Sequence, residues 1–258
     1  MRVFKTHILL NAAILIAAFF LCIPCKADFK AKFIKGKIES ITDTLNDSVS
    51  VHPVKNDDLL EYNQLICTAK DSRGEFQLNL LTLRLGSLSV MSVLGENSFF
   101  LHSGSMLIAC KNKSEFKIST TSSSATFTGS GTILIETTNN GGFKFIPFEG
   151  RGTLKTENKN AQEVRGGRLV LVLGKPSKLG DAYDLDLMLL LRTCRLINSF
   201  PDPLDTFGRI SLAVYSQELK LKGKYNALIG DAPSDTNLQV WAFGEDRDQE
   251  TEKKSKSN

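Results

Sequence analysis

The chain has 258 residues, with 32 Lys or Arg against 28 Asp or Glu, and a formal net charge of +4. Arg2, Lys5 and Lys26 supply three of the positive charges, so the chain after residue 27 carries a net charge of +1. Nucleic-acid binding depends on Lys and Arg neutralising phosphates. A nearly neutral chain of about 230 residues, long enough for one or two domains, therefore predicts no nucleic-acid partner.

The amino terminus has the order of a secretory signal peptide. Arg2 and Lys5 precede an apolar run over residues 8–23, and small residues, Cys25 and Ala27, occupy positions −3 and −1 of a cleavage site. The run is shorter than the ~20 residues of a transmembrane helix. We expect residues 1–27 to be removed after Ala27 and the protein to be periplasmic or secreted. A membrane association is expected only if the leader is retained.

Three cysteines remain after the leader: Cys67, Cys110 and Cys194. An odd number leaves at least one thiol unpaired within the chain. The first interpretation is that all three are small buried apolar residues, and the alternative is a bridge between Cys67 and Cys110. Because no CxxC pair remains, no structural zinc site is expected.

Residues 28–180 alternate apolar and polar side chains in short segments, which predicts β-strands. We expect an opening strand and loop over 28–63 and a β domain over 64–180, with strands at 77–85 and 87–94. Glycines punctuate this domain in similar local settings, where positive φ would favour tight turns: Gly86, Gly104, Gly129 with Gly131, Gly150 with Gly152, and Gly166 with Gly167.

Residues 132–136 and 143–146 flank Asn139–Gly142, and the Asn-Gly centre predicts a β-hairpin. Pro147 cannot donate a ladder hydrogen bond, so its strand is expected at a sheet edge. The predicted fold is mainly β, a roll or sandwich of short antiparallel strands, followed by two short helices.

The period changes over residues 181–244, where we expect a helical extension. Apolar residues at helical spacing would share one face of the first helix: Leu187, Leu190, Leu191, Cys194 and Ile197. Asp184 is the expected N-cap. The second helix is expected over 206–221, with Ile210 and Val214 on a common side. Residues 238–243 alternate like a last strand, and the charged residues 245–258 are expected to be disordered.

Several short motifs follow one another as in the FecR domain, and the order covers about residues 81–176. They are a Thr-rich strand (116–121), an Ala-x-x-x-Gly turn and its following strand (125–136), a Glu-Gly turn (148–150) and a later strand after a glycine turn (167–171). The resemblance implies a shared β scaffold and an interaction role in the cell envelope. Only residues 1–7 precede the apolar run, so sigma-factor control and iron-citrate signalling are not implied.

Candidate catalytic groups are sparse. His102 lies beside Ser103 and Ser105, but neighbouring strand residues point to opposite faces and no Gly-x-Ser-x-Gly elbow is present. His52 is expected on a surface loop. The carboxylate pairs Asp57/Asp58, Asp184/Asp186 and Asp202/Asp205 are expected to serve loops and helix ends. The sequence therefore predicts no catalytic, cofactor-binding or metal-ligating residue, and no cofactor.

One stretch is rich in hydroxyls and is expected to cover an exposed sheet face: Ser119, Thr120, Thr121, Ser122, Ser123, Ser124, Thr126, Thr128, Ser130 and Thr132. Such a face can contact glycans or partner strands. The expected function is that of a non-enzymatic exported FecR-domain protein that binds a protein or glycan of the cell envelope, with a link to envelope signalling left open. The alternative is a structural, self-associating envelope or surface protein.

Overall fold

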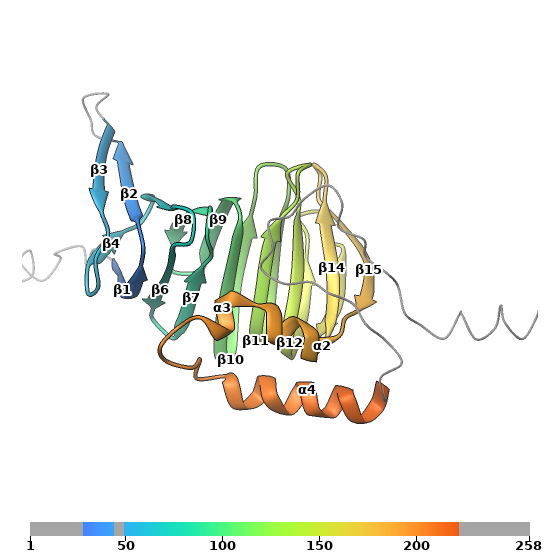
Figure 1. Cartoon of the computed structure of the whole chain (residues 1–258). Coiled ribbons are helices and arrows are strands. Elements are labelled where there is room, and N and C mark those ends of the chain that lie inside the picture. Colours follow the sequence, from blue (N-terminus) through green and yellow to red (C-terminus); the bar gives the residue numbers. More distant parts are fainter. Residues whose placement is uncertain (1–27, 44–48, 222–258) are drawn as a thin grey trace, which may run out of the picture.

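The computed structural model describes residues 28–43 and 49–221. The leader, the expected strand at 238–243 and the charged tail lie outside the described residues. The described chain is mainly β, as the sequence predicts, with short helices after the strands (Figure 1). The strands are β1 (Asp28–Lys35), β2 (Ile38–Asp43), β3 (Val49–Pro53), β4 (Leu59–Glu61), β5 (Leu65–Thr68), β6 (Arg73–Leu78), β7 (Leu81–Leu85), β8 (Val90–Gly95), β9 (Ser98–Ser103), β10 (Ser105–Ser119), β11 (Ser124–Thr137), β12 (Phe143–Lys155), β13 (Ala161–Arg165), β14 (Arg168–Leu173) and β15 (Lys178–Asp184). The helices are α2 (Leu187–Thr193), α3 (Arg195–Asn198) and α4 (Phe207–Leu221).

All fifteen strands belong to one hydrogen-bonded sheet. Its longest path runs β15-β14-β12-β11-β10-β9-β8-β5-β2-β3, and the remaining strands pair beside that path. Pairing is antiparallel except between β9 and β10, which run parallel over three residue pairs. The mixed sheet is thus dominated by antiparallel neighbours.

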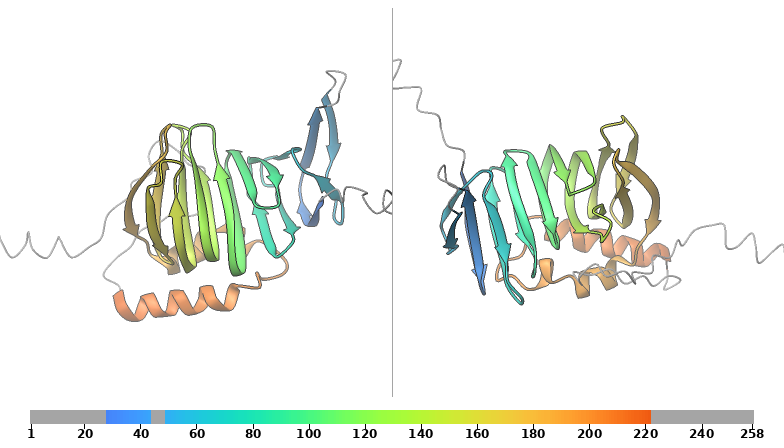
Figure 2. Two further views of the ribbon diagram at one scale, coloured as in Figure 1. Left: turned by 180° about the vertical axis from the view of Figure 1, so that it is seen from behind. Right: turned by 90° about the horizontal axis from the view of Figure 1, so that it is seen from above.

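The long strands change partners halfway along. Residues 106–110 of β10 pair with β7, whereas residues 117–119 pair with β9. Residues 143–145 of β12 pair with β14, whereas residues 151–155 pair with β13. The sheet therefore bends across β10, β11 and β12 and folds back on itself, which makes the predicted roll (Figure 2).

We call the two halves of the roll the first and second layers. The first layer contains β1, β4, β6, β7, β14 and β15 with residues 105–110, 131–137 and 143–149. The second layer contains β2, β3, β5, β8, β9 and β13 with residues 114–119, 124–129 and 151–155. The predicted glycine turns at Gly86, Gly104 and Gly166 lie where the chain passes between layers.

Gly131 and Gly150 show why glycine is needed at the bend. They lie opposite each other on β11 and β12, with φ of +149° and +89°. A Cβ on Gly131 would collide with the carbonyl of Glu149, and one on Gly150 would collide with the carbonyl of Ser130. The bend therefore requires close approach of two backbones, which only glycine permits here.

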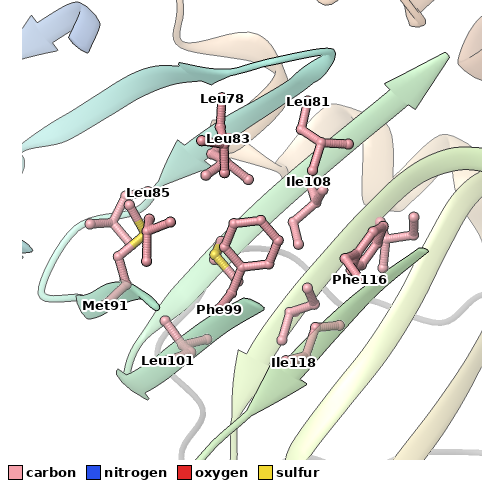
Figure 3. Packing of buried hydrophobic residues seen from close by; sticks show 14 of the residues in the cluster. Leu78, Leu81, Leu83, Leu85, Met91, Phe99, Leu101, Ile108, Phe116 and Ile118 are labelled. Atoms are coloured by element: carbon pink, nitrogen blue, oxygen red, sulfur yellow. The ribbon is translucent and has the colours of Figure 1, made fainter. Parts of the chain in front are cut away.

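The main core lies between the layers. Side chains of β6 and β7 face those of β8 and β9, as Figure 3 shows for Leu83, Leu85, Met91 and Phe99. A chain of phenylalanines continues this core, with ring centroids 6.1 Å apart for Phe99 and Phe116, 5.2 Å for Phe116 and Phe127, and 5.4 Å for Phe127 and Phe145. Edge and tilted contacts of this kind add to the apolar burial.

A second core covers the other side of the first layer. Along β12, Phe143 and Phe145 point into the main core, and Ile146 and Phe148 point toward the helices. The helices lie together across the first layer (Figure 1). The central part of the first layer, residues 105–110, 131–137 and 143–149, is thus buried on both faces.

The two helical predictions hold with one change of boundary. The apolar face predicted over residues 187–197 is packed in the second core, but Cys194 has extended backbone angles and separates α2 from α3. The N-cap is Asp186, whose side chain accepts from the Leu189 amide at 2.9 Å, and not Asp184. Asp184 instead pairs with Arg168 at 2.7 Å. In α4, Ile210 and Val214 are buried as expected.

Three strand predictions are wrong in detail. Residues 28–63 hold four strands of the same sheet, not one strand and a loop. Residues 77–85 span a turn between β6 and β7, where Asn79 has a φ of 51°. Pro147 is buried inside the sheet opposite Ile133, beside a register shift, and its carbonyl accepts from the Gly167 amide at 2.8 Å. A bulge tolerates proline as an edge does.

The three cysteines of the described chain form no disulfide with one another. Cys110 and Cys194 are buried, as the first interpretation expects, and Cys67 is half-buried. Burial raises the pKa of the Cys110 thiol and of the Cys67 thiol. Among the described residues, no helix combines the length and hydropathy needed to cross a bilayer.

Candidate binding face

Part of the hydroxyl-rich stretch lies on the outside of the second layer, where alternate residues of β11 point outward. Thr126 lies between Lys117 on β10 and Lys155 on β12, and Thr128 lies between Glu115 and Thr153. All of these side chains except Thr153 border a hollow of about 520 Å³. We call this surface the open face and define it by the outward residues of the second layer from β10 to β13 and of the adjoining turns: Glu115, Lys117, Ser119, Thr126, Thr128, Arg151, Thr153, Lys155, Glu157, Lys159, Glu163, Arg165 and Lys175.

Two of its carboxylates are already satisfied. Glu115 accepts from the Thr128 hydroxyl at 3.1 Å. Glu157 accepts from the Ser124 hydroxyl at 2.9 Å and pairs with the Lys117 ammonium at 3.2 Å. These donors lower the pKa of Glu157 from its ordinary value, Ser124 contributing most. Both acidic groups are therefore held as hydrogen-bonded carboxylates.

The other half of the hydroxyl stretch is structural, contrary to the expectation of one exposed face. Thr120, Ser123 and Thr132 are buried. The Thr120 hydroxyl donates to the Gly141 carbonyl at 2.6 Å, and the Ser123 hydroxyl to the Gly174 carbonyl at 3.2 Å. The sequence stretch turns and then crosses between layers, so its hydroxyls are divided between turn, core and surface.

His102 does not assemble a nucleophile and base with Ser105. Its imidazole contacts the Ser92 hydroxyl at 3.3 Å and lies against Phe100, with ring centroids 4.3 Å apart. Partial burial lowers the pKa of His102. Ser105 is buried, and its amide donates to Ser89 at 2.9 Å. The hollow of about 270 Å³ beside His102 is lined by hydroxyls, an amide and backbone, without a carboxylate among its lining residues.

Two of the three aspartate pairs serve local structure in the described chain. Asp57 pairs with Lys30 at 2.6 Å, and the Asp58 carboxylate accepts from the Lys55 amide at 2.7 Å. Asp202 and Asp205 border a groove of about 350 Å³ beside β6 and β7. Across the described residues, no three His, Cys, Asp or Glu side chains are grouped to hold a metal ion. His52 is exposed, as expected, but lies in β3 rather than in a loop.

The sequence analysis missed Arg84, the largest fully buried side chain. It pairs with Glu75 at 2.7 Å and donates to the carbonyls of Leu196 at 3.0 Å and Asp202 at 2.7 Å. Its guanidinium also lies 4.1 Å from the ring centroid of Phe200. Arg84 therefore attaches the segment after α2 to the first layer, through partners more than a hundred residues away.

A second buried polar group attaches α4. Glu149 accepts from the Thr132 hydroxyl at 3.0 Å and pairs with Arg209 of α4 at 2.9 Å. Thr132 and Thr206 share a hydrogen bond of 2.6 Å. Burial raises the pKa of Glu149, against the lowering effect of Thr132 and Arg209. These contacts close the outer side of the first layer beneath the helices.

Comparisons with protein-family models, with curated proteins and with solved structures find no match to this chain. The functional argument therefore depends on the residues and their arrangement.

Proposed function

We propose that this protein is an exported, non-enzymatic binding module of the cell envelope and that it binds its partner across the open face. The observation that carries the proposal is the asymmetry of the roll. In the described chain the helices pack on the first layer, and the second layer keeps polar, hydroxyl-bearing strands facing outward. A broad sheet surface with Thr, Ser and Lys side chains offers hydrogen bonds to an extended partner.

The proposed family is FecR-like. The order of the glycine motifs supports it, because each falls where the chain changes layer or turns, as a rolled β scaffold requires. Export is supported by the order of charge, apolar run and small residues in positions 1–27.

A blocking substitution tests the open face. Thr126→Tyr with Thr128→Tyr adds two uncharged, strand-compatible rings to it. Ser211→Tyr with Leu212→Tyr, on the exposed side of α4, is the matched control. Residues 28–258 are tested against purified peptidoglycan sacculi and an array of neutral and anionic bacterial polysaccharides, with circular dichroism as the folding check. Binding should be lost in the Thr126/Thr128 variant and kept in the control; equal binding by both would refute the proposal.

Self-association is the second candidate, and β3 is the observation in its favour. Within the described chain β3 pairs with β2 alone, and Val49 and Val51 are 62% and 50% exposed. Its five residues, Val-Ser-Val-His-Pro, include no Asp, Glu, Lys or Arg. Uncharged edge strands pair readily with other chains. Light scattering should then show an oligomer that Val51→Lys dissociates, and a monomeric wild-type protein would exclude this candidate.

A further inference from the structure

We infer that the ligand of the open face is an anionic polysaccharide, a conclusion that rests on the proposed function and specifies its partner. The open face carries six basic and three acidic side chains. The basic ones are Lys117, Arg151, Lys155, Lys159, Arg165 and Lys175, and the acidic ones are Glu115, Glu157 and Glu163. This local excess contrasts with the near balance of charge over the chain after residue 27.

Most of this positive charge has no ion-pair partner among the described residues. Lys117 pairs with Glu157, but the five other basic side chains make no ion pair with any described residue. Glu115, one of the remaining acids, accepts from Thr128. The surface is thus left with cations that an anionic ligand could pair.

Two arginines of the open face lie so close together that their charge repulsion destabilises the folded protein when no ligand is bound. Arg151 on β12 lies directly opposite Arg165 on β13, and both are exposed. Like charges directly opposite each other in a sheet are destabilising. A bound carboxylate or sulfate between them would remove that repulsion.

The spacing suits a long polymer rather than a compact anion. Lys117 and Lys155 lie on either side of Thr126, two strand spacings or roughly 10 Å apart. Arg151 lies four residues along β12 from Lys155, about 14 Å away. The hydroxyls of Thr126, Thr128 and Thr153 fill the space between these cations. Separated charges with hydroxyls between them match an extended chain of acidic sugars.

The same face is poorly suited to nucleic acid. Single strands are held by aromatic side chains that stack on bases, and the residues that define the open face include none. Glu115 and Glu163 also occupy the row between the Lys117–Lys155 row and the Arg151–Arg165 pair. A continuous phosphate track would meet these carboxylates.

The inference is tested with residues 28–258 and four probes: polygalacturonate, dextran sulfate, neutral dextran and duplex DNA. Affinities are measured by biolayer interferometry over a series of NaCl concentrations. Both anionic polysaccharides should bind, neutral dextran should not, and affinity should fall as salt rises. Arg151→Ser with Arg165→Ser should weaken polysaccharide binding roughly tenfold, and adding Lys155→Ser should weaken it further.

The control removes the same charge elsewhere. Lys35→Ser with Arg192→Ser takes two exposed cations from β1 and α2, and should change affinity less than about twofold. An equal loss in both double variants, or DNA binding as tight as that of the polysaccharides, would overturn the inference. Salt-independent binding of a neutral glycan would also overturn the inference. If the Thr126→Tyr/Thr128→Tyr variant abolished that binding, the proposed function would still stand. Failure of every anionic probe would likewise reject the inference alone.

Discussion

The two halves of β12 belong to different environments. Residues 143–149 are all buried, whereas along residues 151–155 the odd positions are exposed and Leu154 is buried. The first half lies between the main core and the helices, and the second half has a core on one side only. The apolar and polar pattern along β12 therefore changes at the point where the number of covered sheet faces falls from two to one.

The two layers of the roll therefore differ in how many of their faces are covered. The central part of the first layer packs on both faces, and its buried polar residues Arg84 and Glu149 bind the helical segment through Leu196 and Arg209. The second layer contributes one face to the core and leaves the other exposed from β10 to β13, where we propose that the partner binds.

The main core should be the most sensitive part. Phe127→Ala removes a buried ring that contacts Phe116 within the second layer and Phe145 of the first layer, and should lower the free energy of unfolding by about 3–5 kcal/mol. Its neighbour Thr126, on the open face, provides the comparison. Thr126→Ala should stay within about 0.5 kcal/mol of wild type. Urea denaturation measures both, and a similar loss for the two would mean that the layers are not packed as described.

Replacing Arg84 should cause the second-largest decrease in the free energy of unfolding. Arg84→Met fills much of the volume but leaves Glu75 and three carbonyls of the 196–202 segment without this donor. We expect a loss of about 3 kcal/mol. Arg195→Met, which removes an exposed pair with Asp71 at 3.7 Å, should cost about 0–1 kcal/mol. A small effect of Arg84→Met would show that the segment holds without its ion pair.

Local chemistry made much of this division predictable. The Asn-Gly hairpin at residues 139–142 forms because the turn depends on adjacent residues alone. The period of the helices places Leu190 and Ile210 on buried faces. The alternating short segments and the turns between them predicted a mainly β fold, but they did not distinguish a roll from a sandwich.

Contacts distant in sequence were not predictable in this way. Pro147 excludes a ladder donor, a property that suits an edge and a bulge equally, and the pairing of β12 with β14 decides between them. Arg84 acquires its meaning only when the segment around Leu196 folds over it. The hydroxyl stretch was divided because Gly129 and Gly131 carry its end to the other layer.

The cap of α2 should have a moderate effect. Asp186→Ala removes the acceptor of the Leu189 amide and should lower the free energy of unfolding by about 1 kcal/mol. Asp184→Ala removes a half-exposed pair with Arg168 instead, and should cost less. Thermal denaturation compares the two; a larger loss at Asp184 would return the cap to the position that the sequence analysis expected.

Replacing Glu149 should have the smallest effect, which should appear as a change in how the free energy of unfolding depends on pH. Its pKa is raised above the ordinary 4.5, chiefly by burial, so the folded protein holds this proton to higher pH than the unfolded chain does. Folded protein then binds more protons between the two pKa values, and stability must fall as pH rises through that window. The stability that protonated Glu149 contributes is complete below its pKa in the unfolded chain and is lost above its pKa in the folded protein.

The variant that tests this slope is Glu149→Gln, which keeps an acceptor for Thr132 but cannot titrate. Urea midpoints measured from pH 4 upward should fall less steeply with pH in the variant than in wild type. Glu163→Gln on the open face removes an exposed carboxylate of the same sheet and should leave the slope as it is. If Glu149→Gln retained the wild-type slope, the carboxylate beneath α4 would be ionised throughout, with Arg209 outweighing its burial.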